Sequence, residues 1–141
     1  MLDPLGEALH FLRMSGMFYS RSEFTQPWGL KLPTFPGCLM FHMVLSGHCW
    51  VEVKGTEPFL LEPGNLALVP HGKGHCLLSE LGTSAAKLFD LDREEISERY
   101  EIIRHGGGGP TTNMICCTVR YEHPAAHQLI ALLPSLINIQ A

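Results

Sequence analysis

The chain has 141 residues, of which 45% are hydrophobic and 17% are charged, and its formal net charge is -4 at pH 7. These values predict one globular domain over residues 1–141 and exclude a disordered or fibrous chain. The slight acidity also excludes a broad basic surface for phosphate backbones, so we expect no DNA binding by these residues alone.

The first expected element is a short helix in the segment DPLGEALHFLR, residues 3–13. Asp3 can cap its start, and Pro4 suits the first helical position. Leu5, Ala8 and Leu9 then fall on one helical face.

Most of the remaining chain consists of short apolar runs separated by glycine and proline, a pattern typical of strands. The runs are MFYSRSEF (17–24), GLKLP (29–33), CLMFHMVLSG (38–47), HCWVEVKG (48–55), PFLLEPG (58–64), NLALVPHG (65–72), HCLLSELG (75–82), AAKLFDL (85–91), YEIIRH (100–105) and NMICCTVRY (113–121). Ser46-Gly47 is typical of a tight hairpin turn, so we expect the strands on either side of it to pair. Many short strands at even spacing predict a β-sandwich or β-barrel.

Two segments near the C-terminal end carry other signals. REEISERY (93–100) is compatible with a helical turn or with a charged loop. The tail has an apolar stripe at helical spacing, and Pro134 is expected to divide it into two short helices. The stripe consists of Ala126, Leu129, Ile130, Leu133 and Ile137. The same proline interrupts the longest apolar tract, which is therefore too short to span a membrane.

The cysteines favour a reducing compartment. There are five, an odd number; Cys116 and Cys117 are adjacent, and no CxxC pair occurs. A disulfide framework or a structural zinc ribbon is not expected from this pattern, and a cytoplasmic location fits it.

One short motif is specific. Gly64, Pro70, Gly72 and His75 follow the pattern G-x5-P-x-G-x2-H. The first glycine suits a turn into a strand, the proline ends that strand, and the second glycine allows a bend that directs His75 inward. The segment resembles the second conserved motif of the cupin superfamily.

The first cupin motif supplies two histidines and a glutamate as metal ligands, followed by a closing glycine, which Gly47 matches here. Counting back from that glycine places Met40 at the glutamate position. The histidine positions fall on Pro33 and Phe35, or with the shorter spacing on Thr34 and Pro36. The resemblance therefore implies that the ordinary cupin metal site is missing.

A closer resemblance covers about residues 3–139. DPLGEALHFLR, PWGLKLP, FHMVLSGHCWVEVKG, VPHGKGH and MICCTVRYEHP are similar to the cupin-type sensor domain of AraC-family transcriptional regulators. This implies a mainly β fold, a cupin-type β-barrel or jelly roll, with a short N-terminal helix and C-terminal helices. It also implies a small-molecule effector inside the barrel, a homodimer, and DNA contact only through a helix-turn-helix region that is not present in these residues.

The candidate ligand-binding residues are those expected to face the interior. His42 lies two positions after Met40 on one strand and should share its face. For His75 two interpretations stay open: a working imidazole, or a buried histidine bonded to a backbone carbonyl. The expected ligand-binding set is His42, His75, Met40, Trp50 and Cys116.

A cofactor is not expected, with one alternative. His42, His75 and Cys116 could hold Zn²⁺ or another divalent metal and leave a fourth position open. Carboxylates for acid–base chemistry are expected in the interior only at Glu52 or Glu62, because the acidic run of residues 90–98 has the composition of a solvated loop.

Three functions are compatible with these features. The favoured one is an effector-sensing regulatory domain that is not an enzyme. A metal-dependent cupin enzyme, an isomerase or a dioxygenase, is the alternative. A dimerisation module that senses nothing is the third.

Overall fold

The structure is a computed structural model that describes residues 14–121 and 123–139. The helix expected in residues 3–13 lies outside the described residues. The described part is mainly β, with two sheets, one α-helix and one 3-10 helix. The predicted β-rich fold is confirmed at this level.

The first sheet has seven strands in the order β12-β6-β3-β11-β1-β10-β9. Their bounds are β12 Ile137–Ile139, β6 Leu66–Val69, β3 Cys38–Ser46, β11 Thr111–Tyr121, β1 Met14–Thr25, β10 Tyr100–Gly106 and β9 Arg93–Ser97. β1 and β10 run parallel, whereas the other neighbours in this sheet are antiparallel.

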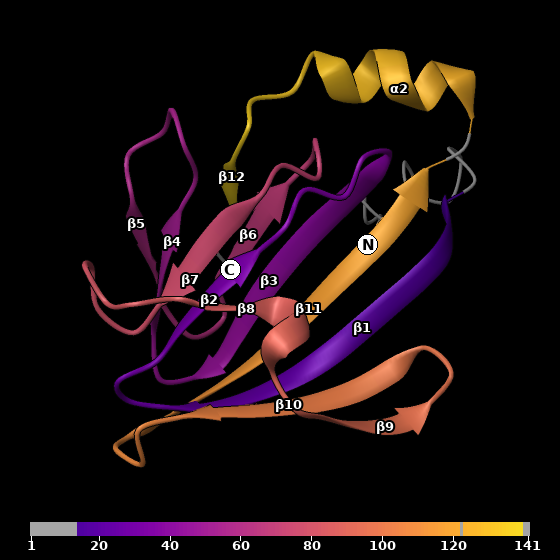
Figure 1. The fold of residues 1–141 in the computed structure, drawn as a ribbon. Helices are drawn as coiled ribbons and strands as arrows, with labels where there is room; N and C mark the ends of the chain where they lie inside the picture. Colours follow the sequence, from indigo (N-terminus) through magenta and orange to yellow (C-terminus); the bar gives the residue numbers. More distant parts are fainter. Residues whose placement is uncertain (1–13, 122, 140–141) are drawn as a thin grey trace.

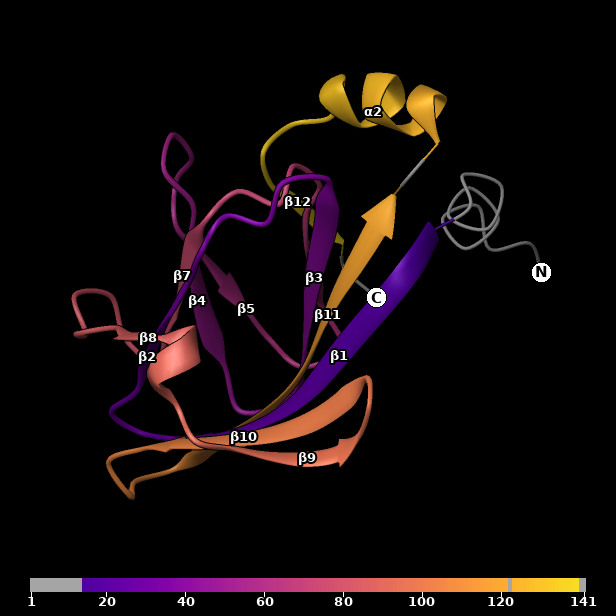
Figure 2. The same cartoon turned by 45° about the vertical axis from the view of Figure 1, so that its right-hand side comes forward.

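The second sheet has five strands in the order β5-β4-β7-β2-β8. Their bounds are β5 Phe59–Leu61, β4 Cys49–Glu52, β7 His75–Leu78, β2 Gly29–Leu32 and β8 Ala86–Lys87. A 3-10 helix, η1, covers Leu88–Asp90, and the α-helix, α2, covers Pro124–Ala131. Figure 1 shows α2 at one end of the molecule, and Figure 2 shows the two sheets facing each other.

The main core lies between the two sheets because alternate residues of their strands point toward each other. Met40 and Val44 of β3 belong to it, as do Val51 of β4 and Leu77 of β7. A second cluster forms where Ala126 and Ile130 of α2 pack with Leu39, Leu68 and Tyr121. Leu39 and Phe41 of β3 thus face α2, whereas Met40 and Val44 face the space between the sheets.

The hairpin expected at Ser46-Gly47 is wrong. β3 pairs with β6 and β11, whereas β4 pairs with β5 and β7 in the other sheet. Gly47 has φ +85, and a Cβ there would lie 2.5 Å from the Thr112 hydroxyl oxygen. The turn therefore carries the polypeptide from one sheet to the other. It passes so close to Thr112 that only glycine fits at position 47.

Two further predictions need correction. REEISERY is neither a helical turn nor a loop: β9 pairs antiparallel with β10. The second of the two expected C-terminal helices is also wrong, because Ile137–Ile139 is a strand that pairs with β6. The helix before Pro134 is confirmed, and Ala126 and Ile130 are its buried positions. None of the described residues belongs to a helix that is both long and apolar enough for a membrane crossing.

Gly72 explains part of the motif around His75. It has φ +62, and a Cβ would overlap the carbonyl oxygen of Phe35 and lie 2.7 Å from that of Cys38. Gly72 also accepts a hydrogen bond from the Phe35 N–H at its carbonyl. The glycine therefore lets two loops touch through their backbones.

We expect Gly72→Ala to lower the free energy of unfolding by about 3 kcal/mol, because it combines a left-handed backbone with a backbone clash. Gly55→Ala is the matched control: Gly55 has φ +90 but nothing within 4 Å of its Cβ position. That variant should lose only about 1 kcal/mol. Equal losses in urea denaturation of the two variants would contradict the steric argument.

Candidate functional site

A chain of hydrogen bonds crosses the space between the sheets. The Sγ of Cys116 lies 2.8 Å from Nδ1 of His42. The Nε2 of His42 lies 2.7 Å from Nε2 of His75, and Nδ1 of His75 lies 2.8 Å from the carbonyl oxygen of Lys73. Cys116 and His42 are register partners on β11 and β3, whereas His75 comes from β7 of the other sheet. The imidazole pair therefore links the two sheets.

The Lys73 carbonyl decides which atom donates and which accepts in each of these hydrogen bonds. The Lys73 carbonyl only accepts, so Nδ1 of His75 carries the hydrogen, and Nε2 of the neutral ring is the acceptor. His42 must then donate from Nε2 and accept at Nδ1, which leaves the Cys116 thiol as the donor. These tautomers are assigned from the network of partners.

Burial keeps all three side chains neutral. Burial lowers the pKa of His42 well below its usual value, and the neighbouring His75 lowers it further. Burial also lowers the pKa of His75, partly opposed by its bond to the Lys73 carbonyl. The pKa of Cys116 is raised by burial and then by Cys117, so the thiol keeps its proton. The hydrogen-bond pattern requires His42, His75 and Cys116 to be neutral.

This geometry does not fit the metal alternative. A metal needs its donors around one point, but the two ring nitrogens of His42 face different partners, Cys116 on one side and His75 on the other. The two Nε2 atoms sit at hydrogen-bond distance from each other. No group of three His, Cys, Asp or Glu side chains arranged for a metal occurs among the residues that the structure describes.

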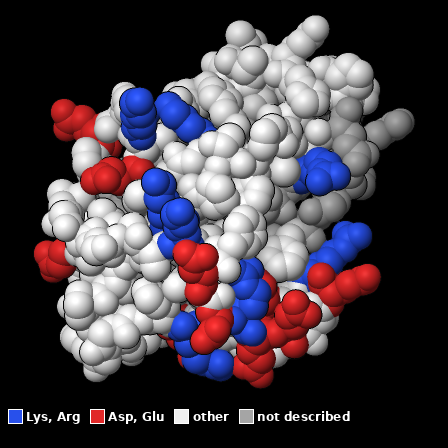
Figure 3. Space-filling model, viewed as in Figure 1, with Lys and Arg blue, Asp and Glu red and all other residues white. Residues whose placement is uncertain are grey.

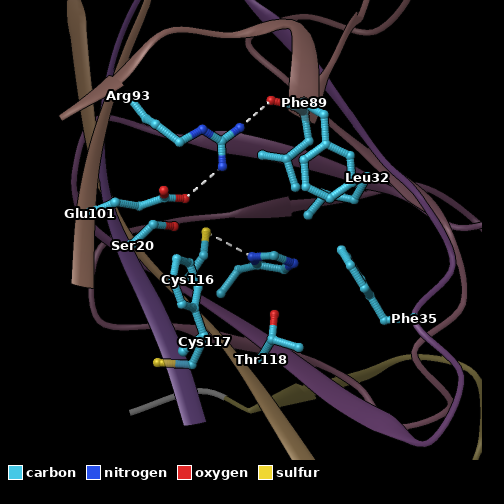
Figure 4. Close-up of a pocket in the computed structure, with 12 residues that line it drawn as sticks. Ser20, Leu32, Phe35, Phe89, Arg93, Glu101, Cys116, Cys117 and Thr118 are labelled. Carbon is cyan, nitrogen blue, oxygen red and sulfur yellow. Dashed lines mark hydrogen bonds and ion pairs between the residues drawn. The ribbon is translucent and has the colours of Figure 1, made fainter. Parts of the chain in front are cut away.

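A cavity of about 210 Å³ lies beside the hydrogen bond between His42 and Cys116. It is lined by Phe18, Ser20, Leu32, Phe35, His42, Leu88, Phe89, Arg93, Glu101, Cys116, Cys117 and Thr118. Figure 4 shows two unlike walls: Ser20, Glu101 and Cys116 on one side, and Leu32, Phe35 and Phe89 on the other. The first group belongs to the seven-stranded sheet, and the second comes from β2, the loop after it, and η1.

A salt bridge lies at the polar wall. Nη1 of Arg93 donates to Oε1 of Glu101 at 3.0 Å, and Nη2 donates to the carbonyl oxygen of Leu88 at 2.7 Å. The Arg93 guanidinium lies 5.7 Å from the centre of the Phe89 ring, and the Phe89 ring meets Phe35 edge-on. The Glu101 side chain is only 5% exposed, so this carboxylate is a buried charge with one pairing partner.

The structure places the five expected ligand-binding residues in different settings. His42 and Cys116 line the cavity. His75 is buried behind His42, and its bond to Lys73 matches the backbone-carbonyl interpretation. Met40 is buried in the core and is not among the residues that line the cavity.

The expectation for Trp50 is wrong about its face. Cys49 and Val51 of β4 point into the core with no exposed surface, so Trp50 between them points to the outer side of its sheet, where it is half-buried. It cannot share the interior with His42. Glu52 follows on the same outer face and is exposed, as is Glu62, so neither supplies an interior carboxylate.

Sequence reasoning missed Arg93 and Glu101. A signal for Glu101 did exist: it lies two positions before Ile103 in an alternating strand, and both residues are buried. The composition of residues 93–100 does not identify a strand, so the sequence gives no sign that Arg93 lies beside Glu101. The exposed acidic residues of the same region, such as Glu94 and Glu95, do match the solvated surface that their composition indicates.

The proposed proton direction predicts a difference between two variants of Cys116. Cys116→Ser keeps a donor for Nδ1 of His42, so the free energy of unfolding should stay within about 1 kcal/mol of the parent protein. Cys116→Ala leaves that nitrogen without a donor and should cost about 2 kcal/mol. Urea denaturation compares the two. A serine variant no more stable than the alanine variant would contradict a donating thiol.

Comparison with known protein families assigns the chain to one of them. The family model described as Cupin matches residues 3–141 of the chain. No curated protein matches the sequence.

Proposed function

The chain belongs to the cupin family, and we propose that it is the ligand-sensing domain of an AraC-type bacterial transcription regulator. In this proposal a small-molecule effector occupies the cavity beside His42. The observation that carries the proposal is the cavity itself, which joins an apolar aromatic wall to a buried ion pair. Small-molecule sites commonly combine apolar lining with a few placed polar groups in this way.

The positions of the usual metal ligands support sensing over catalysis. Met40 stands at the glutamate position and is buried in the core. With the longer motif spacing, Phe35 stands at a histidine position and supplies an aromatic wall of the cavity. The imidazoles of His42 and His75 bind each other through their Nε2 atoms. We therefore propose that the domain binds an effector without turning it over.

An effector changes a protein only through unequal affinity for two of its conformations. The cavity offers a route to such a difference because η1 forms part of its wall and is held by the Arg93 bond to Leu88. A molecule that fills the cavity would restrain η1 against the seven-stranded sheet. We propose that this restraint is the signal passed to the rest of the regulator.

The remaining parts of the proposal concern partners and location. α2 exposes Leu129 (54%), and Leu132 just after it is 82% exposed. Figure 3 shows the charged side chains of this view mainly away from the end where Figure 1 places α2. We propose that this apolar end supports homodimer formation, that DNA is contacted by a helix-turn-helix region outside these residues, and that the protein is cytoplasmic.

A thermal-shift screen with small metabolites tests the sensing function. At a concentration of 100 Kd, a bound compound should stabilise the protein by about 2.7 kcal/mol. Ser20→Phe places a ring in the cavity and should abolish the shift, whereas Ser84→Phe, on an exposed loop residue, should keep it. A library without any stabilising compound, or a shift that survives in Ser20→Phe, would contradict the proposal. Turnover of a compound that depends on an added divalent metal would support the enzyme alternative instead.

A further inference from the structure

The polar wall of the cavity has unused hydrogen-bonding capacity on one group, Glu101. Only Oε1 accepts from Arg93, and no described residue donates to Oε2. Glu101 is 4% exposed and lines the cavity. A ligand in the cavity that supplies a donor to Oε2 would therefore add a charge-assisted hydrogen bond.

Arg93 already binds two partners on this wall. Its two terminal nitrogens donate to Glu101 and to the Leu88 carbonyl, and the Phe89 ring lies close to the guanidinium. Arg93 keeps N–H donors that these two bonds do not use. A ligand carboxylate or phosphate that reached them would also approach the Glu101 carboxylate, which lies 3.0 Å from Nη1, and would be repelled by it. A ligand with an N–H donor leaves the salt bridge intact and adds a partner to the free oxygen.

The opposite wall suits the same kind of ligand. Phe35 and Phe89 present aromatic rings, and Leu32 and Leu88 add apolar surface. Aromatic faces attract cations, and they pack well against an apolar body. His42 and Cys116, which also line the cavity, are held neutral, so they bring no competing charge.

We propose that the cavity takes a small protonated amine with a compact apolar body. The ammonium group donates to Oε2 of Glu101, and the apolar body lies against Phe35, Phe89 and Leu32. The volume of about 210 Å³ is below the range typical of drug-sized ligands, which favours one ring or a short alkyl chain. This ligand class rests on the proposed sensing function and makes it more specific.

Three probes of similar shape and different charge test the ligand class. They are 2-phenylethylamine, which is protonated at pH 7, the neutral 2-phenylethanol and the anionic 3-phenylpropanoate. Isothermal titration calorimetry with the whole chain at pH 7 should show the amine binding roughly 10- to 100-fold more tightly than the alcohol, because the contact to Glu101 is charge-assisted. The anion should bind most weakly.

Variants locate the contact. Glu101→Gln keeps the shape of the side chain and should reduce amine affinity to that of the alcohol. Glu94→Gln removes the same charge from an exposed residue of β9 and should leave the affinity unchanged. Should Glu101→Gln fail to fold, the order of affinities for the three probes on the unaltered protein decides the question.

Other outcomes overturn the inference, and they do so separately from the sensing function. Tighter binding of 3-phenylpropanoate would make the cavity an anion site, while sensing would stand. Failure of all three probes at millimolar concentration would overturn the amine class, and the metabolite screen would still decide whether the cavity senses anything. Amine binding unaffected by Glu101→Gln would place the ligand elsewhere.

Discussion

Replacing His42 by alanine is expected to lower the free energy of unfolding by about 4 kcal/mol. The variant loses both bonds of a buried ring: the Cys116 thiol loses its acceptor, and Nε2 of His75 loses its donor. It also opens a void in a core where His42 is 1% exposed. Marginal domain stabilities of about 5–15 kcal/mol make this a severe loss.

Equilibrium urea denaturation followed by tryptophan fluorescence measures the effect. His48→Ala is the matched control, because His48 is half-buried and makes one ring hydrogen bond, to the Ser79 carbonyl. It should cost about 1 kcal/mol. His42→Phe separates the two terms: it restores the volume but not the hydrogen bonds, and should recover only part of the loss. A His42→Ala variant as stable as His48→Ala would show that the chain of bonds contributes nothing.

Lowering the pH from 7 to 5 is expected to remove up to about 4 kcal/mol of stability through two histidines. Burial lowers the pKa of His42 and of His75 in the folded state, whereas both return to about 6.5 on unfolding. Below that value the unfolded chain takes up protons that the folded chain refuses, so stability falls as the pH falls. Each histidine contributes about 1.4 kcal/mol per pH unit until its folded pKa is reached.

Urea denaturation at closely spaced pH values between 5 and 7 measures the slope. Carboxylates titrate mainly below this window, so the histidines dominate it. His75→Gln removes one of the two groups, and its slope should be about half that of the parent protein even though its absolute stability is lower. Stability that stays constant from pH 7 to 5, or a slope unchanged in His75→Gln, would contradict the conclusion that His42 and His75 are neutral in the folded protein.

Strands were predictable from the sequence, but their partners were not. Glycine and proline mark the strand ends locally, and each of the ten expected runs overlaps a strand. Pairing depends on the whole fold. Ser46-Gly47 has the composition of a hairpin turn, yet the same residues carry the chain across to the other sheet, because β4 finds its neighbours in β5 and β7.

The prediction of a second C-terminal helix was wrong for a related reason. Ile137 fits a helical stripe and equally fits a short strand. The edge of β6 was free to accept a strand, and pairing with it satisfied backbone groups that a short isolated helix would have left exposed. The spacing of apolar residues in the C-terminal segment does not show that β6 has a free edge, or that this edge lies close to residues 137–139.

The candidate site was found in part. The alternation that starts at Met40 predicts that His42 faces the interior, and the motif predicts that His75 does so too. Both side chains are buried. Whether donors converge on a point or form a line depends on the sheets that carry them. His42 and His75 come from facing sheets, while Cys116 lies beside His42 on the neighbouring strand, and this arrangement gives a line. The pairing of Arg93 with Glu101 required β9, which the sequence left open.

The position of β11 in its sheet has a consequence for synthesis of the protein. β11 lies between β3 and β1, and β1 pairs with β10 on its other edge. During translation, β1 and β3 emerge long before β11, so the edges that pair with β11 stay unpaired until residue 121 has left the ribosome. Any fragment that ends before this point lacks the centre of the seven-stranded sheet. We expect such fragments to aggregate through those open edges rather than to form a smaller stable domain.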